Sequence, residues 1–505
     1  MMAIVVLCDL TIYRGDGFAG HAALFVVAPL LLLLGTERLR PVAALWVLAP
    51  MLLLLAARML WCGSALALVV GFALLVCFAM SLNGIRPYLL EAVVFASQTV
   101  HAGYRGLVAY WRSLAQSVPV GRTSLNHTHW LAILLPFVAF VAFSLLFTLA
   151  NPDLLEAISK ELARSFEVFR VWLVEFSPQP LEVLFCLAVG WVTIGLLRPL
   201  MAVREVSDGE RPPVEVAVPP APAPLYAAVR NTLAVVIALF SVYLVFEFKT
   251  LWFRVFPKGF HYSGYAHEGA AWLTVALALA TVTLSLIFRG RILNDDRVRR
   301  LRTLAWFWSI ENIVLAIAVF HRLFIYIGFN GMTRMRTIGL LGSSAVLVGF
   351  ILVLWKIAHN RNFVWLLRRH LWTVAIAVYL YAVLPVDALV MSYNVGRIMG
   401  GDPAPCVQIS VHPTSPEGLL LLRPLLTCKD DLIRQGVLAM LAERDAKAES
   451  LVVRRRQDSW TAFQVAEDRL LSMLRAEASE WSDYVDQSAR EAALSKFHKY
   501  AYQWF

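Results

Sequence analysis

The sequence predicts an all-α fold: a polytopic transmembrane helical bundle of about ten spans, followed by a small soluble helical C-terminal domain. Of the 505 residues, 59% are hydrophobic and 16% are charged, whereas soluble globular proteins have about 25% charged residues. The mean hydropathy is +0.66. The apolar residues form long runs, without the period-two segments of about 10 residues that an outer-membrane barrel requires.

Ten runs are long enough to cross a bilayer, because a helical span needs about 20 predominantly apolar residues. They lie at 18–35, 41–58, 63–82, 129–150, 179–199, 229–248, 270–288, 304–327, 338–357 and 371–390. Residues 1–13 are apolar but shorter than a span. They lack the basic region and the small-residue cleavage site of a signal peptide. We therefore expect a shortened leading helix that lies against the bundle.

Composition divides the chain into four parts. Residues 1–204 form an N-terminal membrane half with spans 1–5, and the Pro-rich residues 205–224 form a cytoplasmic linker. Residues 225–394 form a second membrane half with spans 6–10, and residues 395–505 form the soluble domain. In that domain, Ser415 followed by Glu417 can start a short helix, and periodicity predicts helices over 429–447 and 448–481.

The distribution of charge predicts an orientation. The net charge is +10, yet the chain from Val395 onward holds 14 Lys and Arg against 15 Asp and Glu, so the basic excess lies in the membrane part. If the loop at 36–40 is cytoplasmic, the cytoplasmic loops hold 20 basic residues and the outer loops as far as Arg336 hold 10. The positive-inside rule then predicts a multi-pass protein of the cell inner membrane with an extracytoplasmic C-terminal domain. Its expected partner is the lipid bilayer and not nucleic acid.

The loop at 83–128 places five aromatic residues among scattered arginines: Tyr88, Phe95, Tyr104, Tyr110 and Trp111. This pattern predicts an amphipathic helix in the headgroup layer. A helix that binds a partner or packs in the core fits the pattern equally well. A protein partner is therefore expected, if there is one, at 83–128 or at 395–505.

The stretch from Phe307 to Arg336 is apolar enough to span, yet it contains Glu311, Asn312, His321 and Arg322. A charged side chain at mid-bilayer depth costs about 2.5–3.5 kcal/mol. Such residues therefore face a protein interior or a wet cavity.

Three polar clusters fall at the outer ends of spans under this topology. The first contains Tyr262, Tyr265, His267 and Glu268; the second His321, Arg322, Tyr326, Thr333, Arg334 and Arg336; the third Asp387, Tyr393 and Asn394. Arg322 presents five donors, so Asp387 or Glu268 is its expected partner. Gly331 and Thr333 suit a tight turn between two spans. These groups either pair with one another and fix the helix register, or form an outward-facing polar pocket for a ligand or ion.

Signatures of enzymes and metal sites are weak. His267-Glu268 begins like a zinc-protease motif, but position 271 is Ala where the second His belongs. We expect no catalytic residues, no metal and no cofactor. Cys406 and Cys428 are a possible disulfide if the C-terminal domain is outside the cytoplasm. The small residues Gly339, Gly342, Ser343, Ser344, Ala345 and Gly349 predict a helix-packing face.

Five short motifs, taken in their order along the chain, resemble those of a known group of proteins. They are DLTIY at 9–13, YSGYAHEG at 262–269, HRLFIYIGFNGMTRMR at 321–336, VDALVMSYN at 386–394 and SWTAF at 459–463. In these the chain resembles the bacterial polytopic membrane proteins grouped as domain-of-unknown-function families 4153 and 4173. The resemblance covers most of the chain and implies the architecture, but it implies no activity.

The sequence thus favours an integral membrane protein, most readily a non-enzymatic one whose outward polar pocket serves transport or sensing. The convergence of Arg322, Tyr326, Arg334, Asp387 and Asn394 motivates this prediction. The alternative is a membrane scaffold or accessory subunit of an envelope complex, in which the polar cluster is purely structural. An enzyme acting on lipid or envelope precursors is least favoured.

Overall fold

The computed structural model describes residues 1–36 except 16, then 42–99, 102, 103, 106, 180–197, 226–252, 262–288, 297–359, 361–457 and 460–504. These residues fall into two compact units: a first unit of Met1–Tyr13 with Ser97–Leu200, and a second unit of Arg14–Ala96 with Met201–Phe505. No strand occurs in the described ranges, so the predicted all-α class is confirmed.

The first unit contains α1 (Met2–Cys8), the π-helix η1 (Asp9–Tyr13) and α8 (Pro180–Leu197), together with the described helical residues 97–99, 102, 103 and 106. The chain's first residues are helical as predicted, and they pack on α8. The rings of Tyr13 and Phe185 lie 5.4 Å apart between centroids, and the Cys186 thiol donates to Asp9 at 3.8 Å. The predicted span at 129–150 and the predicted linker at 205–224 lie outside the described residues.

The membrane helices of the second unit are α2 (Phe18–Gly35), α3 (Leu45–Cys62), α4 (Ala65–Leu82), α9 (Tyr226–Glu247) with the π-helix η2 (Phe248–Trp252), α10 (Tyr262–Ile287), α11 (Val298–Asn330), α12 (Arg334–Ala358) and α13 (Phe363–Val383). In the described part of the chain, seven helices are long and apolar enough to cross a membrane: α2, α3, α4, α9, α11, α12 and α13. Shorter apolar stretches at 181–197 and 270–285 coincide with two further predicted spans. The predicted membrane bundle is thus confirmed.

Polar side chains set the starts of several membrane helices. The side chains of Ser64, Thr333 and Asn362 accept hydrogen bonds from the backbone N–H groups of Ala67, Arg336 and Trp365, at 3.2, 3.2 and 2.7 Å. Such caps satisfy donors that the first turn of a helix leaves unpaired.

The tenth predicted span, 371–390, is misplaced. The helix α13 begins at Phe363 behind its Asn362 cap and ends at Val383. Pro385 follows at once, and a proline disfavours helical backbone in the residue before it. The chain restarts as α14 (Val386–Met399), so residues 386–390 are not part of the span.

The C-terminal helices are α14, α15 (Cys406–Val411), α16 (Pro416–Leu419), the 3-10 helix η4 (Leu420–Thr427), α17 (Asp431–Gln457), η5 (Trp460–Ala462), α18 (Val465–Ala476), η6 (Ala478–Tyr484), α19 (Gln487–Ala501) and η7 (Tyr502–Trp504). They share one hydrophobic core, which includes Met391, Leu422, Ile433 and Trp481. The helix α17 continues across the predicted break between residues 447 and 448, so that break is wrong. The domain boundary at 394 stays a prediction, although α14 crosses it and contributes to this core.

The possible disulfide between Cys406 and Cys428 stays a prediction, and the structure gives the two residues as thiols. Both residues are free and buried, at 0% and 5% exposure. Burial raises the pKa of the Cys406 thiol to about 12, and the charges of Asp430 and Asp402 add to the effect. Since the thiolate is the form that oxidises, this apolar setting disfavours oxidation.

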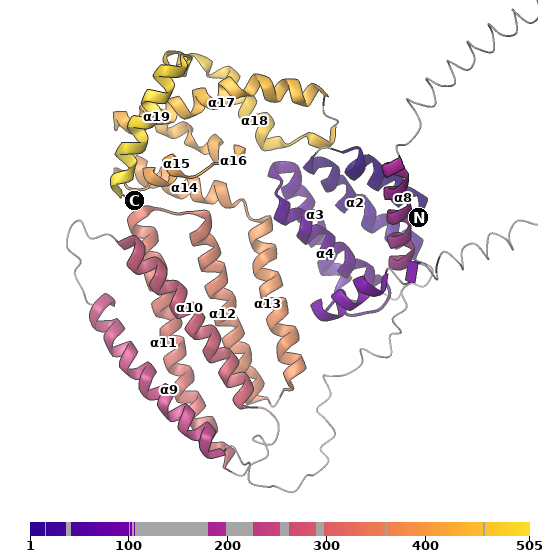
Figure 1. Ribbon diagram of the computed structural model, residues 1–505, viewed down its shortest axis with the longest axis vertical. Helices are drawn as coiled ribbons and strands as arrows, with labels where there is room; N and C mark the ends of the chain where they lie inside the picture. The colour runs from indigo at the N-terminus through magenta and orange to yellow at the C-terminus, as the bar shows by residue number, and fades with distance from the viewer. Residues whose placement is uncertain are drawn as a thin grey trace, which may run out of the picture. The chain divides into compact units, whose positions relative to one another are not determined.

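The C-terminal helices gather at one end of α11, α12 and α13 (Figure 1). The start of α2 reaches the same helices, because a Cβ atom on Gly17 would stand 2.5 Å from the Cα of Ala462. Figure 1 shows the starts of α10 and α12 at this end, while the turn between α12 and α13 lies at the opposite end.

Only the first part of the segment at 83–128 is described, and residues 89–99 of it form a helix. Phe95 is 1% exposed, and Glu91 accepts a hydrogen bond from Arg368 of α13 at 2.5 Å. One face of this helix is therefore packed in the core, whereas Leu90, Val93 and Val94 on it are 42%, 66% and 44% exposed. Its predicted headgroup contact falls largely on residues outside the described ranges.

Candidate functional site

Arg322 lies in the middle of the polar stretch of α11 and forms a buried ion pair with Glu247. Its Nε and Nη2 atoms donate to Glu247 Oε1 and Oε2 at 2.7 and 2.5 Å. The two side chains are 5% and 1% exposed, and Tyr243 also donates to Glu247, at 2.9 Å. Two parallel bonds to one carboxylate are the strongest geometry that an arginine can adopt. The pair therefore joins α9 to α11.

This partner corrects the prediction that Arg322 pairs with Asp387 or Glu268. Glu247 is the last residue of α9, and it follows an apolar run that gave no sign of a paired acid. It lies beside α11 because α9 and α11 pack along their lengths (Figure 1). His321, next in the chain, does not join the pair: its ring lies 4.9 Å from that of Trp252.

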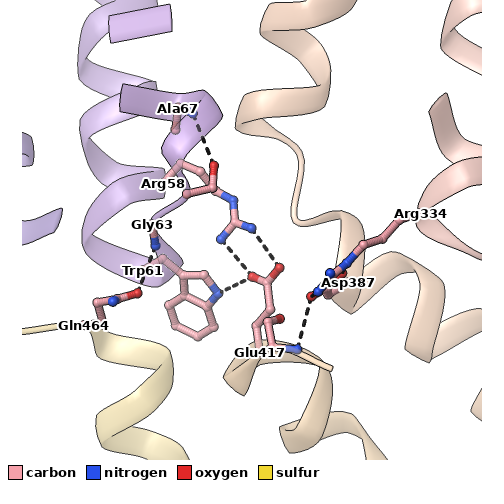
Figure 2. Close-up of polar contacts among 10 residues, drawn as sticks. Arg58, Trp61, Gly63, Ala67, Arg334, Asp387, Glu417 and Gln464 are labelled. Atoms are coloured by element: carbon pink, nitrogen blue, oxygen red, sulfur yellow. Dashed lines mark hydrogen bonds and ion pairs between the residues drawn. The ribbon is translucent and has the colours of Figure 1, made fainter. Parts of the chain in front are cut away.

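Asp387 pairs instead with Arg334, in a two-pronged ion pair between the first turns of α12 and α14 (Figure 2). It also accepts a hydrogen bond from the backbone N–H of Ser415 at 3.2 Å. Burial acts to raise the pKa of Asp387, but the hydrogen bonds from Arg334 and Ser415 outweigh it and hold that pKa below its ordinary value. The ionised Asp387 carboxylate thus connects α14, on which it lies, to α12 and to the segment before α16.

The turn between α11 and α12 is held by Asn394 of α14. The Asn394 side chain accepts from Met332 N–H at 2.7 Å and donates to the Met332 carbonyl at 2.9 Å. Gly331 adopts φ +84° and ψ −169°, a conformation open essentially to glycine alone. The tight turn predicted at Gly331 and Thr333 is confirmed.

The remaining residues of the second and third clusters surround this turn. The guanidinium of Arg336 lies 3.7 Å from the centre of the Tyr326 ring and donates to the Gly331 carbonyl. Tyr393 is 41% exposed, and Arg397 lies 5.8 Å from its ring centre. Of the first cluster, the backbone of Tyr262, Tyr265, His267 and Glu268 forms the start of α10, while their side chains lie outside the described residues.

A further polar group escaped the sequence analysis. Arg58 near the end of α3 donates two hydrogen bonds to Glu417 of α16, at 2.8 and 2.7 Å, and Trp61 donates to the same carboxylate at 3.0 Å (Figure 2). Gln464 accepts from Gly63 N–H at 2.9 Å beside it. The signal that could have revealed this site is an arginine within the apolar run at 41–58.

The predicted site residues whose side chains make the ion pairs and turn contacts above fall into two groups. Arg322 is held by Glu247 within the membrane helices, whereas Arg334, Asp387, Asn394 and Thr333 build the junction with the C-terminal helices. In both groups the charged atoms named above are paired within the chain. Among the described residues, no three His, Cys, Asp or Glu side chains lie together as a metal site would require.

A large apolar groove lies beside these clusters, between α10, α12 and α13. Its volume is about 720 Å³. Its lining is apolar except for Thr281, Ser285, His370 and Tyr381. Thr281 and His370 each bond a backbone carbonyl of their own helix, those of Leu277 at 2.8 Å and Leu366 at 2.9 Å. The groove therefore offers few polar groups to an occupant.

The small-residue face of α12 contributes both to packing and to this groove. Ser343 lies 3.3 Å from Thr274 of α10, and a Cβ atom on Gly349 would stand 3.1 Å from the His370 ring of α13. At these positions the predicted helix packing is confirmed. Gly342 and Ala345 line the groove, as Gly349 also does, and a Cβ atom on Gly342 would meet nothing within 4 Å.

The apolar helices and the ion pair buried between α9 and α11 define a polytopic α-helical integral membrane protein. A comparison with protein families found one match, over residues 1–411, to the family described as "Domain of unknown function (DUF4153)". The chain belongs to this family. The second resemblance, to family 4173, stays a prediction. No curated protein and no solved structure matched the chain.

Proposed function

We propose that this membrane protein is non-enzymatic and binds the long hydrocarbon chain of a membrane lipid in the groove between α10, α12 and α13. The observation that carries the proposal is the cavity of about 720 Å³ with its almost entirely apolar lining. Ligand pockets of about 300–1,000 Å³ are typical for small molecules. A hydrocarbon chain needs no polar partners, so an apolar groove can hold it. An ion or a polar solute would lose its bonds to water there and gain no hydrogen bonds in return.

The extent of the groove supports a chain-like occupant. On α13 the lining residues run from Phe363 to Tyr381, 18 residues apart, which is about 27 Å at 1.5 Å per residue. The hydrocarbon core of a bilayer is about 30 Å thick. A lipid tail lying along α13 would therefore be accommodated over most of its length.

The polar residues that motivated the prediction of an ion or polar-ligand pocket support a different role. Arg322, Arg334, Asp387 and Asn394 bond one another, Glu247 or the α11–α12 turn. We assign them to holding helices and the C-terminal helices in register. Transport or sensing of a lipid remains compatible with this assignment, because the groove itself does not use these side chains.

The test is photolabelling of the protein in bilayers with a phosphatidylethanolamine that carries a diazirine at the end of one acyl chain. We expect labelled peptides from α12 and α13. In Gly342→Leu a side chain fills the groove, and labelling there should fall by about tenfold, since a lost 1.4 kcal/mol of affinity is a factor of ten. The matched control is Gly328→Leu on α11, because Gly328 also has nothing within 4 Å and does not line the groove.

Equal labelling of the wild type and Gly342→Leu would overturn the proposal. So would label confined to lipid-facing residues such as Leu239 and Val242 of α9, which are 63% and 70% exposed. The scaffold alternative would be favoured if either result were accompanied by a partner protein that co-purifies with this chain in fixed stoichiometry. Truncation of this chain after Asn394 should then abolish the co-purification.

We also propose that the C-terminal helices lie on the extracytoplasmic side of the cell inner membrane. Basic residues gather at the opposite end of the bundle, where α11 begins with Arg299, Arg300 and Arg302. The test is labelling of intact cells with a membrane-impermeant maleimide. Ser488→Cys on α19 should react and Thr303→Cys on α11 should not; both positions are exposed. The reverse pattern would refute this orientation.

A further inference from the structure

Glu311 lies within the membrane part of α11 and is not part of either polar group described above. Its Oε1 atom accepts a hydrogen bond from Ser241 of α9 at 2.5 Å. Its Oε2 atom is buried and has no hydrogen-bond partner. At the same level of α11, Asn312 Oδ1 and Trp308 Nε1 are also buried without a partner. The helix contact between α9 and α11 thus leaves polar atoms unused here.

The surroundings of Glu311 are those of a lipid-facing surface. Ile310, Ile313 and Ile317 of α11 are 59%, 39% and 51% exposed. Across the contact, Leu239 and Val242 of α9 are 63% and 70% exposed. Glu311 is 13 residues from the start of α11, about 20 Å along the helix axis. Its carboxyl group therefore lies where hydrocarbon, and not water, surrounds the helices.

No cation compensates this carboxyl group among the described residues. Most titratable side chains of the helices packed on α11 are engaged elsewhere, and Lys249 of η2 lies eight residues beyond Ser241 in the chain. On α9, Glu247 bonds Arg322, Tyr243 donates to Glu247, and Arg230 bonds Asn231 at the far end. On α12, Arg334 bonds Asp387, Arg336 bonds Gly331, and Lys356 donates to the Ser285 carbonyl at 3.1 Å.

The other two sources of charge are equally remote from Glu311. The helix α10 carries no ionisable side chain from Ala270 to Ile287. On α11 itself, Arg302 lies nine residues before Glu311 and His321 ten residues after it, each more than two turns away. An ionised carboxylate without a partner in an apolar medium is strongly disfavoured, and such a group takes up a proton instead.

We infer that Glu311 and Ser241 form a proton-binding site within the membrane, in which the Glu311 carboxyl is neutral and its Oε2 carries the proton. Ser241 donates to Oε1 but carries no positive charge, so it cannot neutralise an ionised Glu311 carboxylate. The site is distinct from the lipid groove: neither residue lines it, and the inference does not depend on lipid binding.

The test uses N,N′-dicyclohexylcarbodiimide on the full-length protein in bilayers. A protonated carboxyl adds across a C=N bond of this reagent: its oxygen bonds the central carbon and its proton passes to nitrogen. The adduct rearranges to a stable N-acylurea without a leaving group, and peptide mass spectrometry locates it. We expect label on Glu311. The rate should fall about tenfold for each pH unit above the midpoint of titration.

The matched control is Glu247, whose two carboxylate oxygens both accept from Arg322 and which should stay unlabelled. Glu311→Gln should remove the label, while Ser241→Ala should retain it with a shifted pH midpoint. If Glu311→Gln does not fold, the wild-type pH profile with peptide mapping still decides the matter.

Three results would overturn the inference. The first is a Glu311 that stays unlabelled in the bilayer and reacts only in denaturing detergent. The second is label on Glu247 to the same extent. The third is protection of Glu311 by sodium at constant pH, which would make the site one for a metal cation and not for a proton.

Discussion

Arg58 and Glu417 are 359 residues apart in the chain, yet their side chains form a two-pronged ion pair with bonds of 2.8 and 2.7 Å (Figure 2). The pair joins the end of the membrane helix α3 to the short helix α16. Trp61, one turn further along α3, donates to the same carboxylate. Together with the Arg334–Asp387 pair, it indicates that the C-terminal helices dock on the bundle through charged groups.

Breaking this pair should destabilise the protein strongly. Arg58→Met leaves Glu417, whose side chain is 2% exposed, without its cation. Loss of one partner of a buried pair costs about 3–5 kcal/mol. Thermal unfolding in detergent should show the loss, and Arg58→Met with Glu417→Leu should recover part of it. The control is Arg434→Met, whose exposed pair with Asp431 on α17 should be worth at most about 1 kcal/mol. Equal losses in both variants would contradict the docking role.

The Arg322–Glu247 pair should behave as a structural pair. Arg322→Met strands the buried Glu247 carboxylate, so the yield of monodisperse protein should drop. The double variant Glu247→Leu/Arg322→Met removes both charges and should restore the yield, because a buried pair can often be replaced by apolar residues without loss. Gel filtration of the three variants measures the outcome. A single variant that purifies normally but loses activity would instead support the polar-ligand pocket.

Gly331 should not tolerate a side chain. Its backbone has φ +84°, and a Cβ atom there would stand 2.5 Å from Asn394 Oδ1. Gly331→Ala should therefore destabilise the protein by about 1–3 kcal/mol. Gly328→Ala, three residues earlier in the helical part of α11, should be neutral or stabilising by about 0.5–1 kcal/mol, since alanine favours helix. A lower melting temperature for Gly328→Ala than for Gly331→Ala would show that the turn tolerates a side chain at Gly331.

Acid pH should weaken the junction at His412. Burial lowers the pKa of His412 below 6.5, and the charges of Arg336 and Arg334 lower it further. The unfolded chain then takes up the proton more readily than the folded one. The contribution of His412 to stability is complete above pH 6.5 and is lost as the pH falls through the folded pKa. The melting temperature of the wild type should be lower at a pH below the folded pKa of His412 than at a pH above 6.5. This difference should be smaller in His412→Gln. His359→Gln, beyond the opposite end of α12, should leave the difference unchanged.

The fold class and the course of most membrane helices could be predicted from the amino-acid sequence. Apolar runs report burial in lipid directly, because a helix satisfies its own backbone groups and each span needs the same length. The tight turn at Gly331 could be predicted from the sequence because turn formation depends on the preferences of a few neighbouring residues. The end of the tenth span was missed because Pro385 stops α13 while the apolar character continues into α14.

Which charged residues pair with one another could not be predicted, because it depends on how the helices pack. Arg322 could have paired with any acid near the same membrane depth, and its partner Glu247 is chosen by the packing of α9 against α11. The ion pair of Arg58 with Glu417 likewise depends on a residue that is remote in the chain, and so does the open space beside Gly342. Ion pairs and cavities are relations between distant segments, and hydropathy along one segment carries no information about the segment that will face it.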